Sequence, residues 1–549
     1  MEWLLLRRVS RFFFVALVFC CGVTFAQQAP GSVATPVASA DAACGQCHAK
    51  ILHSYLATPM ANASGLATER AKPGVLEHKA SGIRYSLSSE DGRFVLSYQD
   101  PKSFEIPTSR GLDYILGSGH LGLTYLYSLN HYLFESPVAW YAASQSLDMK
   151  PGVESATQAP PALPVQAECL RCHMSAVHRS DPGSLNRYSG LPFLHTGITC
   201  ESCHGDTRSH LASGGKAAVV NPSKLTAERR DSVCISCHLE GDVSVERAGR
   251  SALDYMPGDS ISDYLSYFVF KGQGATQRGV SEVEQLGQSM CKRSSGDAMS
   301  CTSCHDPHFT PAPEEKAAYY RGKCLTCHTG PRFASAHHPE NPDCASCHMQ
   351  RVGAANIAHV AWTDHRILRV PSRPDATAAK SETLVPVFSP AAGERDLAVA
   401  YYKAVLEGNA SLQQKAYDSL LLLRSGLSHD NEALVALGIL SEERGDLTQA
   451  QQLFRQVLQA DPVNLTALSN LGTLLGRSGD VQGAITLWRP AFERNEATVG
   501  LAKNLALVEC AAGDATAARA TLETALQYSP GLREVVQLLG RVSNCNDSR

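Results

Sequence analysis

The sequence has no marked excess of charge of either sign and no long apolar run after its first 26 residues. Its 549 residues carry a formal net charge of −4, and 19% of them are charged. Nothing therefore indicates a nucleic-acid-binding protein, which would carry clustered Lys and Arg. Because no later segment approaches the ~20 apolar residues of a spanning helix, we expect no membrane span in the mature chain.

Cysteines are also scarce outside one repeated pattern. Of the 19 cysteines, 14 lie in Cys-x-x-Cys-His motifs, which leaves Cys20, Cys21, Cys291, Cys510 and Cys545. A disulfide framework would not keep all its pairs at one short spacing, because bridges between residues three apart close poorly. A structural zinc site does not require His directly after every second Cys. Cys510 and Cys545 could pair or remain free, and the sequence does not decide.

The repeated pattern is that of c-type haem attachment. Two thiols form thioethers with the porphyrin vinyl groups, and the adjacent His ligates the iron. The sequence therefore predicts seven haem c groups with their irons, and a protein that moves electrons. The motifs are Cys44, Cys47 and His48; Cys169, Cys172 and His173; Cys200, Cys203 and His204; Cys234, Cys237 and His238; Cys301, Cys304 and His305; Cys324, Cys327 and His328; Cys344, Cys347 and His348.

The N-terminus predicts export. Arginines precede an apolar run at residues 12–25, and the small Ala26 closes it, so residues 1–26 are expected to be a signal peptide. A permanent anchor helix is the alternative, but the run is short for a spanning helix. A lipoprotein signal at Cys20 is disfavoured by the bulky Phe19 before it. We expect the mature chain in the periplasm or outside the cell.

The rest of the chain divides into two halves. A Pro/Ala-rich linker at 27–40 precedes a predicted haem domain at 41–370, and a second linker at 371–390 precedes a repeat domain at 391–540. The haem domain shows little sustained helical periodicity, as expected where porphyrins rather than apolar side chains fill the interior. The predicted fold class is therefore mainly α with extensive irregular structure.

A small β region is expected in the long gap between the first two motifs. Ile83–Leu87 and Phe94–Tyr98 flank Asp91-Gly92, which is typical of a β-hairpin. An aromatic-rich stretch follows from Tyr114 to Tyr141. We expect it to pack against haem and core, with a substrate pocket or an electron relay as the alternatives.

The second half repeats every 34 residues, the length of a tetratricopeptide repeat. Gly445-Asp446, Gly479-Asp480 and Gly513-Asp514 recur at that period, and an irregular earlier unit is expected at Asp396–Leu423. Such hairpins of helices stack into a solenoid with a concave surface, which we expect to dock a redox partner protein. A plain α-helical bundle is the alternative. Two further positions repeat at the same 34-residue period. One is small, at Ala450, Ala484 and Ala518, and the other is large, at Phe454, Trp488 and Leu522.

The ligand on the side of the iron opposite each motif His distinguishes an electron carrier from an enzyme. Two strong-field ligands favour electron transfer, whereas an open position admits substrate. The first half offers twelve further His for seven positions, which favours mostly bis-His iron. Met60 could supply a thioether ligand, with ordinary packing as the alternative. The candidates for the distal position are His120, His195, His210, His308, His359, His365 and Met60.

Six segments carry a wider pattern: Cys44–Ala63, Gly117–Tyr127, Thr199–Gly205, Arg229–His238, Ser300–His308 and His359–Ile367. Together with the motifs they resemble the multihaem cytochrome c superfamily with paired Cys-x-x-Cys-His motifs, related to the tetrahaem cytochromes of ammonia oxidisers. The match is to its bacterial branch with C-terminal tetratricopeptide repeats, and it covers nearly the whole mature chain. The resemblance implies closely spaced haem pairs with mostly bis-His iron. It also implies distal ligands at His120, His195, His210, His308, His359 and His365, but no settled activity.

Electron transfer with partner docking is therefore the function that the sequence predicts. The alternative is a multihaem oxidoreductase of small nitrogen or sulfur compounds, acting at a haem with an open position. Cys-x-x-Cys-Lys, the variant at the catalytic haem of ammonia-forming nitrite reductases, does not occur. The catalytic residues of such an enzyme and the oligomeric state stay open. A pure assembly scaffold is disfavoured by the seven attachment sites.

Overall fold

The structure is a computed structural model. The expected signal peptide at 1–26 and the linker at 27–40 lie outside the residues it describes, as does much of the second linker. Within the described part of the chain, no helix is long and apolar enough to cross a membrane. The described residues are 41–101, 107–272, 278–330, 333, 341, 343–354, 359–370, 381–388, 393–542 and 545.

The predicted hairpin is confirmed and belongs to a larger sheet. Strands β3 (Ile83–Glu90) and β4 (Arg93–Gln99) pair antiparallel with Glu90 opposite Arg93. The two turn residues, Asp91 and Gly92, have φ of 48° and 76°. These positive values suit the type I′ turn of a two-residue hairpin. β2 (Gly74–His78) and β5 (Thr108–Leu112) complete the strand order β2-β3-β4-β5.

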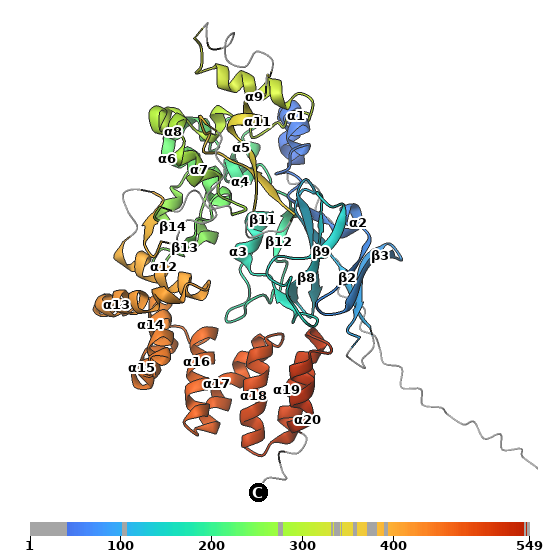
Figure 1. The fold of residues 1–549 in the computed structure, drawn as a ribbon, viewed down its shortest axis with the longest axis vertical. Coiled ribbons are helices and arrows are strands. Elements are labelled where there is room, and N and C mark those ends of the chain that lie inside the picture. Colours follow the sequence, from blue (N-terminus) through green and yellow to red (C-terminus); the bar gives the residue numbers. More distant parts are fainter. Residues whose placement is uncertain are drawn as a thin grey trace, which may run out of the picture. The chain divides into compact units, whose positions relative to one another are not determined.

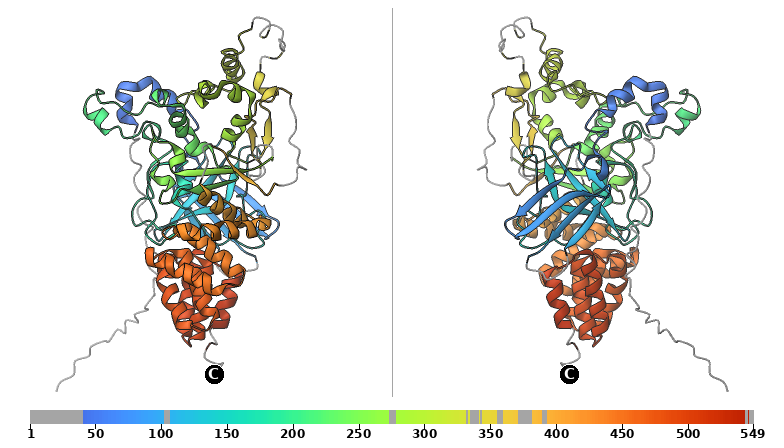
Figure 2. Two further views of the ribbon diagram at one scale, coloured as in Figure 1. Left: turned by 90° about the vertical axis from the view of Figure 1, so that its left-hand side faces the viewer. Right: turned by 90° about the vertical axis from the view of Figure 1, so that its right-hand side faces the viewer.

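The aromatic stretch forms most of a second sheet, so the small hairpin region predicted from the sequence understates the strand content. Tyr125 and Phe134 are fully buried in its core, which agrees with the packing interpretation. The two sheets lie beside each other in Figure 2. The second sheet contains β1 (Ser64–Leu66), β6 (Tyr114–Leu116), β7 (Gly122–Leu129), β8 (Tyr132–Tyr141), β9 (Ser146–Met149) and β10 (Leu163–Pro164).

The motifs lie on or beside short helical segments. In a helical turn, residues three and four apart share one face, so both thiols and the His of a motif point to the same side. The segments are α1 (Ala42–Leu56), α3 (Ala167–Leu170), α4 (Glu201–His204), α6 (Ala227–His238), η5 (Cys301–Ser303), α9 (Lys316–Leu325) and α11 (Cys344–His348).

Short strands and helices connect these segments. The strand pairs are β11 (Met174–Val177) with β12 (Phe193–Thr196), and β15 (Arg351–Gly353) with β16 (Ala361–Thr363); β13 (Val243–Glu246), β14 (Leu265–Phe270) and β17 (Leu384–Pro386) form a small sheet. The further α-helices are α2 (Ala67–Arg70), α5 (Arg208–Ala212), α7 (Glu282–Gln288) and α8 (Met290–Ser295).

The C-terminal half consists of successive helical hairpins, as the repeats predict (Figure 1). The irregular first unit is α12 (Glu394–Leu406) with α13 (Gln413–Leu423). The regular units follow as α14 (Asn431–Glu443) and α15 (Leu447–Ala460), α16 (Leu465–Arg477) and α17 (Val481–Arg494), α18 (Val499–Ala511) and α19 (Ala515–Tyr528), and then α20 (Arg533–Val542).

Each Gly-Asp pair makes the turn of a hairpin. Gly445, Gly479 and Gly513 have φ of 84°, 89° and 84°. Glycine adopts this left-handed region without the steric cost of a Cβ. The following Asp caps the next helix, because its carboxylate accepts a hydrogen bond from the backbone N–H three residues on. The 34-residue period therefore reflects the same Gly-Asp turn in three successive helical hairpins.

The packing inside each hairpin explains the other repeated positions. A Cβ on Gly438 would lie 2.6 Å from Phe454 Cε1, and one on Gly472 would lie 2.3 Å from Trp488 Nε1. In the third unit Ala506 occupies the small position, and the partner at the large position is Leu522, also fully buried. A smaller partner thus leaves room for the methyl group.

Cys510 and Cys545 form a disulfide, which settles the pairing that the sequence left open. It joins the C-terminal part of α18 to the chain after α20.

Candidate haem-binding cavity

A cavity of about 3410 Å³ lies among the motif segments. Side chains of five motifs line it, those beginning at Cys44, Cys169, Cys200, Cys234 and Cys301. Packed protein interiors leave few voids larger than a water molecule, so a space of this size suits large cofactors. The donor set fits as well, because thiols for thioether attachment and imidazoles for iron face the same space.

Backbone carbonyls orient several motif imidazoles. Nδ1 of His173 is 3.2 Å from the Ala63 carbonyl, and Nδ1 of His204 is 2.8 Å from the Val220 carbonyl. Nδ1 of His348 is 2.7 Å from the carbonyl of Leu368. When Nδ1 donates its hydrogen to a carbonyl, Nε2 is the nitrogen that remains for a metal.

The pKa shifts favour the neutral imidazole, which is the form that ligates iron. Burial, with a smaller contribution from the neighbouring His365, lowers the pKa of His305 to about 4. Burial also lowers the pKa of His173 and of His308. At neutral pH these imidazoles are therefore neutral and can bind iron without first losing a proton.

Two motif imidazoles lie beside a distal candidate at the ring separation that an iron between them would require. The ring centroids of His204 and His308 are 6.0 Å apart with planes 9° apart. Those of His305 and His365 are 6.3 Å apart with planes 34° apart. Two metal–nitrogen bonds of about 2.0 Å, together with the two ring radii, span about 6 Å. We therefore propose His308 as the distal ligand of the third motif and His365 as that of the fifth.

Three other distal candidates line the cavity without such a partner. Nδ1 of His210 is 2.7 Å from the Ala217 carbonyl, which leaves its Nε2 available. Nδ1 of His195 is buried and has no hydrogen-bond partner within the described residues. Met60 also lines the cavity. Each could reach an iron, and the structure does not match them to particular motifs.

His120 and His359 are not among the side chains that line the cavity. His120 is exposed. Nε2 of His359 lies 2.8 Å from Asp148 Oδ2, and its ring lies 5.1 Å from that of Tyr141. In this arrangement the nitrogen that would bind iron is engaged by a carboxylate.

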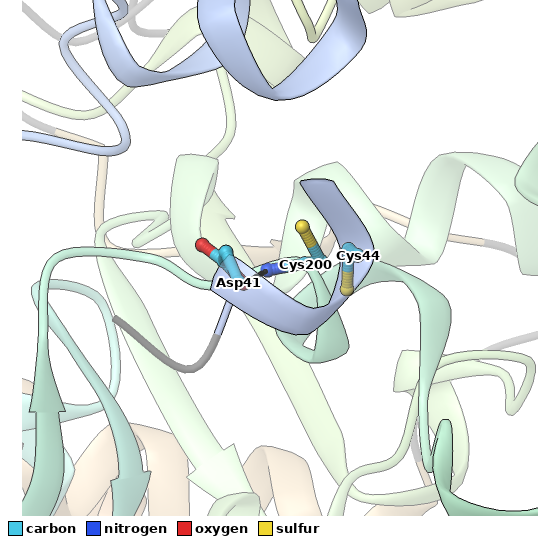
Figure 3. A group of neighbouring side chains, drawn as sticks. All are labelled: Asp41, Cys44 and Cys200. Carbon is cyan, nitrogen blue, oxygen red and sulfur yellow. Dashed lines mark hydrogen bonds between the residues drawn. The ribbon is translucent and has the colours of Figure 1, made fainter. Parts of the chain in front are cut away.

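Thiol groups of different motifs lie close together in several pairs. Figure 3 shows Cys44 and Cys200 beside Asp41, with their ligand atoms within 4.8 Å of one another. Asp41 Oδ1 accepts a hydrogen bond from the Cys200 backbone N–H at 2.8 Å, at the start of α4. Because both thiols belong to predicted attachment motifs, we interpret the group as a contact of two motifs rather than a metal site. The thiols also lie close together in the pairs Cys172 and Cys237, Cys234 and Cys301, and Cys324 and Cys344.

Sequence reasoning did not single out the polar groups between the second and fourth motifs. Arg171 lies in the cavity wall, and the hydroxyl groups of Tyr255 and Tyr267 are buried nearby. The one available signal was the position of Arg171 between Cys169 and Cys172.

Comparisons with known proteins match separate segments of the chain. Residues 295–333 match the doubled CXXCH motif, and residues 138–205 match the family of cytochrome c554 and c-prime. Residues 435–488 and 469–532 match tetratricopeptide repeats. The multiheme cytochrome MtrA of Shewanella baltica is 26% identical over 180 residues, covering 30% of this chain and 53% of that protein. The chain thus spans about half the length of this curated relative.

Solved structures resemble little more than a quarter of the chain. MamA of AMB-1 is 18% identical with a TM-score of 0.25, covering 28% of this chain and 82% of that one. PilF of Pseudomonas aeruginosa is 19% identical with a TM-score of 0.24, covering 27% of this chain and 67% of that one.

Proposed function

We propose that this chain, a multihaem cytochrome with C-terminal tetratricopeptide repeats, binds seven haem c groups and passes electrons along them. Bound haem c supplies a one-electron carrier at each motif. The observation that carries the proposal is the cavity of about 3410 Å³, into which five motifs and the distal candidates His308 and His365 face.

Contacts between motifs support a continuous route. The thiol of each motif Cys marks the porphyrin edge that it holds, so neighbouring thiols imply neighbouring porphyrin edges. Cys44 and Cys200 join the first motif to the third, Cys234 and Cys301 join the fourth to the fifth, and Cys324 and Cys344 join the sixth to the seventh. These contacts make three pairs of neighbouring motifs, and Cys203 near Cys237 and Cys304 near Cys327 connect the pairs to one another.

Counting haems tests the number seven. Mass spectrometry of the exported protein should give the mass of the mature chain plus seven haems, and the alkaline pyridine spectrum should give the same ratio. A holoprotein with fewer than seven attached haems would contradict the proposal.

We place the protein in the periplasm or outside the cell. Support comes from the predicted signal peptide, since haem c is attached to a chain after its export. N-terminal sequencing of the mature protein should begin at Gln27. An intact N-terminus would overturn this placement.

We propose that the repeats dock a redox partner protein through a surface that the rest of the chain leaves free. One side of the repeats already binds the first half: Asn495 Nδ2 donates to the Gly183 carbonyl at 2.7 Å, and its Oδ1 accepts from the Leu185 N–H at 3.0 Å. Leu422 on α13 remains 82% exposed. Leu422→Glu should slow reduction by the partner but not by a small dye, and equal partner rates would contradict this site.

The alternative, a multihaem oxidoreductase of small nitrogen or sulfur compounds, draws support from one observation. Glu135 lines the cavity near Cys169 and His173, accepts a hydrogen bond from Thr124 at 2.9 Å and pairs with Lys150. Such a pair could supply protons to a substrate at the second motif. Electron paramagnetic resonance distinguishes the oxidoreductase from the electron-transfer protein, because a high-spin signal that shifts with nitrite or hydroxylamine would favour the enzyme.

A further inference from the structure

We infer that electrons pass between the haems and an external redox protein at the place where the repeats border the haem-binding cavity, beside Lys403 and Glu432. We infer further that the second and fourth sites are the haems that exchange electrons there. The inference rests on the proposed electron-transfer function and deepens it, because it names the point of exchange and the sites that serve it.

The first helix of the repeats is fixed to the haem half by a shared core. α12 packs along β13 and β14 (Figure 1), and the fully buried Val399 of α12 belongs to one hydrophobic cluster with Val245 and Phe268 of these strands. Nη1 of Arg395 also donates to the Glu246 carbonyl at 2.7 Å. Parts of a chain that share an apolar core do not move independently. The distance from the surface of α12 to the haem sites is therefore set by packing.

Two side chains of the repeats reach the cavity itself. Lys403 on α12 and Glu432 on α14 line it, and they form an ion pair at 2.9 Å with about a third of each side chain exposed. Nζ of Lys403 also donates to the Ser244 carbonyl at 3.2 Å, and Ser244 of β13 lines the cavity as well. The repeats thus form part of the cavity wall. A protein held on α12 or α14 would lie against that wall.

Successive contacts lead from Ser244 to two attachment motifs. Ser244 lies directly opposite Tyr267 of β14, and opposite residues of antiparallel strands have their side chains on the same face. Tyr267 lies beside Arg171, which is inside the second motif. Nη1 of Arg171 donates to the carbonyl of Ser236, which is inside the fourth motif. The wall that the repeats share is therefore connected to the second and fourth motifs.

The arrangement of the motifs makes this a useful place for exchange. The thiols of Cys172 and Cys237 lie close together, so the second and fourth sites are neighbours. The fourth motif also contacts the fifth, through Cys234 and Cys301. An electron delivered beside Lys403 therefore arrives at sites that have further haem sites on both sides.

A tethered photoreductant tests the exchange point in the holoprotein without a partner protein. A ruthenium polypyridyl complex is attached to Leu406→Cys, because the Leu406 side chain is 65% exposed and follows Lys403 by three residues, on the same face of α12. A flash transfers one electron from excited ruthenium(II), which becomes ruthenium(III), to a ferric haem. Cys291→Ser is the common background, since that cysteine is free and outside the motifs.

The matched control carries the same label at Leu507→Cys on α18, where the wild-type side chain is 51% exposed. Tunnelling weakens steeply with distance, so transient absorption should show faster haem reduction from residue 406 than from residue 507. Equal rates from the two labels would overturn the inference. This comparison uses the full set of haems and needs no change at an attachment site.

Removing single haems identifies the receiving sites. With the label at residue 406, variants that lose the second or the fourth haem should each lose part of the fast phase, whereas a variant that loses the seventh should keep all of it. A full fast phase in both of the first two variants, or its loss in the third, contradicts the assignment. The variants are Cys169→Ala/Cys172→Ala, Cys234→Ala/Cys237→Ala and Cys344→Ala/Cys347→Ala, each with its haem content measured by mass spectrometry.

The outcomes separate this inference from the proposed function. Equal rates from the two labels in a protein with seven attached haems refute the exchange point and leave electron transfer standing. If Leu422→Glu does not slow the partner while the label at residue 406 gives the fast phase, the docking site on α13 is wrong and the exchange point beside Lys403 stands.

Discussion

An imidazole can complete an iron only if one of its nitrogens is free and faces the metal. His308 and His365 meet the first condition and lie 6.0 Å and 6.3 Å, centroid to centroid, from the motif rings of His204 and His305. Nε2 of His359 is instead engaged by Asp148, so in this arrangement only its Nδ1 is left for a metal. His359 can therefore serve as the control when His308 and His365 are tested as distal ligands.

Replacing a distal His should change the spin state of one haem. His308→Ala and His365→Ala each remove a strong-field ligand, so each should convert one low-spin haem to high spin. Electron paramagnetic resonance at low temperature measures this directly. His359→Ala should leave the spectrum unchanged. A high-spin signal from His359→Ala alone would reverse the assignment.

A buried acid in the repeats should make stability depend on pH. The Glu509 side chain is fully buried, and burial raises the pKa of its carboxyl despite Arg489 at 2.7 Å. The folded state therefore holds this proton to higher pH than the unfolded chain, and stability falls as pH rises above the usual Glu value. Glu509→Gln should melt at the same temperature as wild type near pH 4 and a few degrees higher near pH 8, which is about 1 kcal/mol in a domain of this size.

Thermal unfolding followed by circular dichroism at both pH values checks this. A variant less stable than wild type at pH 8 would mean that the ion pair with Arg489 outweighs the cost of burial.

How much of the candidate site the sequence predicts depends on how far apart in the chain the interacting residues lie. The attachment chemistry is local, because Cys44, Cys47 and His48 fall within five consecutive residues. The pairing of His204 with His308 is not, since about a hundred residues separate them and only the fold brings them together. The contact of Arg171 is non-local in the same way, since its Nη1 donates to the carbonyl of Ser236, 65 residues further along the chain.

At the scale of elements, local rules predicted the repeats well and the sheets poorly. The Gly-Asp turns depend on a positive φ and on a cap three residues away, both visible in sequence. In the first half, Asp91-Gly92 predicted one hairpin, but pairings such as Ser64 with Leu116 join segments some fifty residues apart. No local pattern specifies such a partner.

The small position of the second hairpin offers a sharp test of this packing. Gly472→Ala would place a methyl carbon 2.3 Å from Trp488 Nε1, and Trp488 is only 3% exposed. We expect a loss of about 1–3 kcal/mol in the free energy of unfolding, measured with urea. Gly540→Ala is the control: nothing lies within 4 Å of its Cβ in α20, so it should be neutral or stabilise by up to about 1 kcal/mol. Similar effects of the two substitutions would contradict the close approach of α16 and α17.

At the scale of the molecule, the thiol contacts place the fourth motif between the other sites, and we propose it as the main junction of the electron route. The fourth motif touches the second through Cys237 and Cys172 and the fifth through Cys234 and Cys301, and Cys203 of the third lies close by. The first motif connects through the third, while Cys304 of the fifth lies near Cys327 of the sixth, which leads to the seventh. The thiol contacts thus make the fourth site the main junction between the first three sites and the last three. His308, three residues after the fifth motif, gives a second link, because its ring lies 6.0 Å from that of His204 in the third motif.

Removing the fourth haem should slow electron exchange between the two groups of sites. In Cys234→Ala/Cys237→Ala, a single electron delivered by flash reduction should stay within one group of three haems on the timescale in which wild type equilibrates. Transient absorption would then show a new slow phase, because the added gap weakens tunnelling between the groups. Cys344→Ala/Cys347→Ala also removes one haem, but at the end of the route, so the remaining six should equilibrate in one fast phase. If both variants equilibrate alike, the fourth site is not the junction and the route must contain a second crossing.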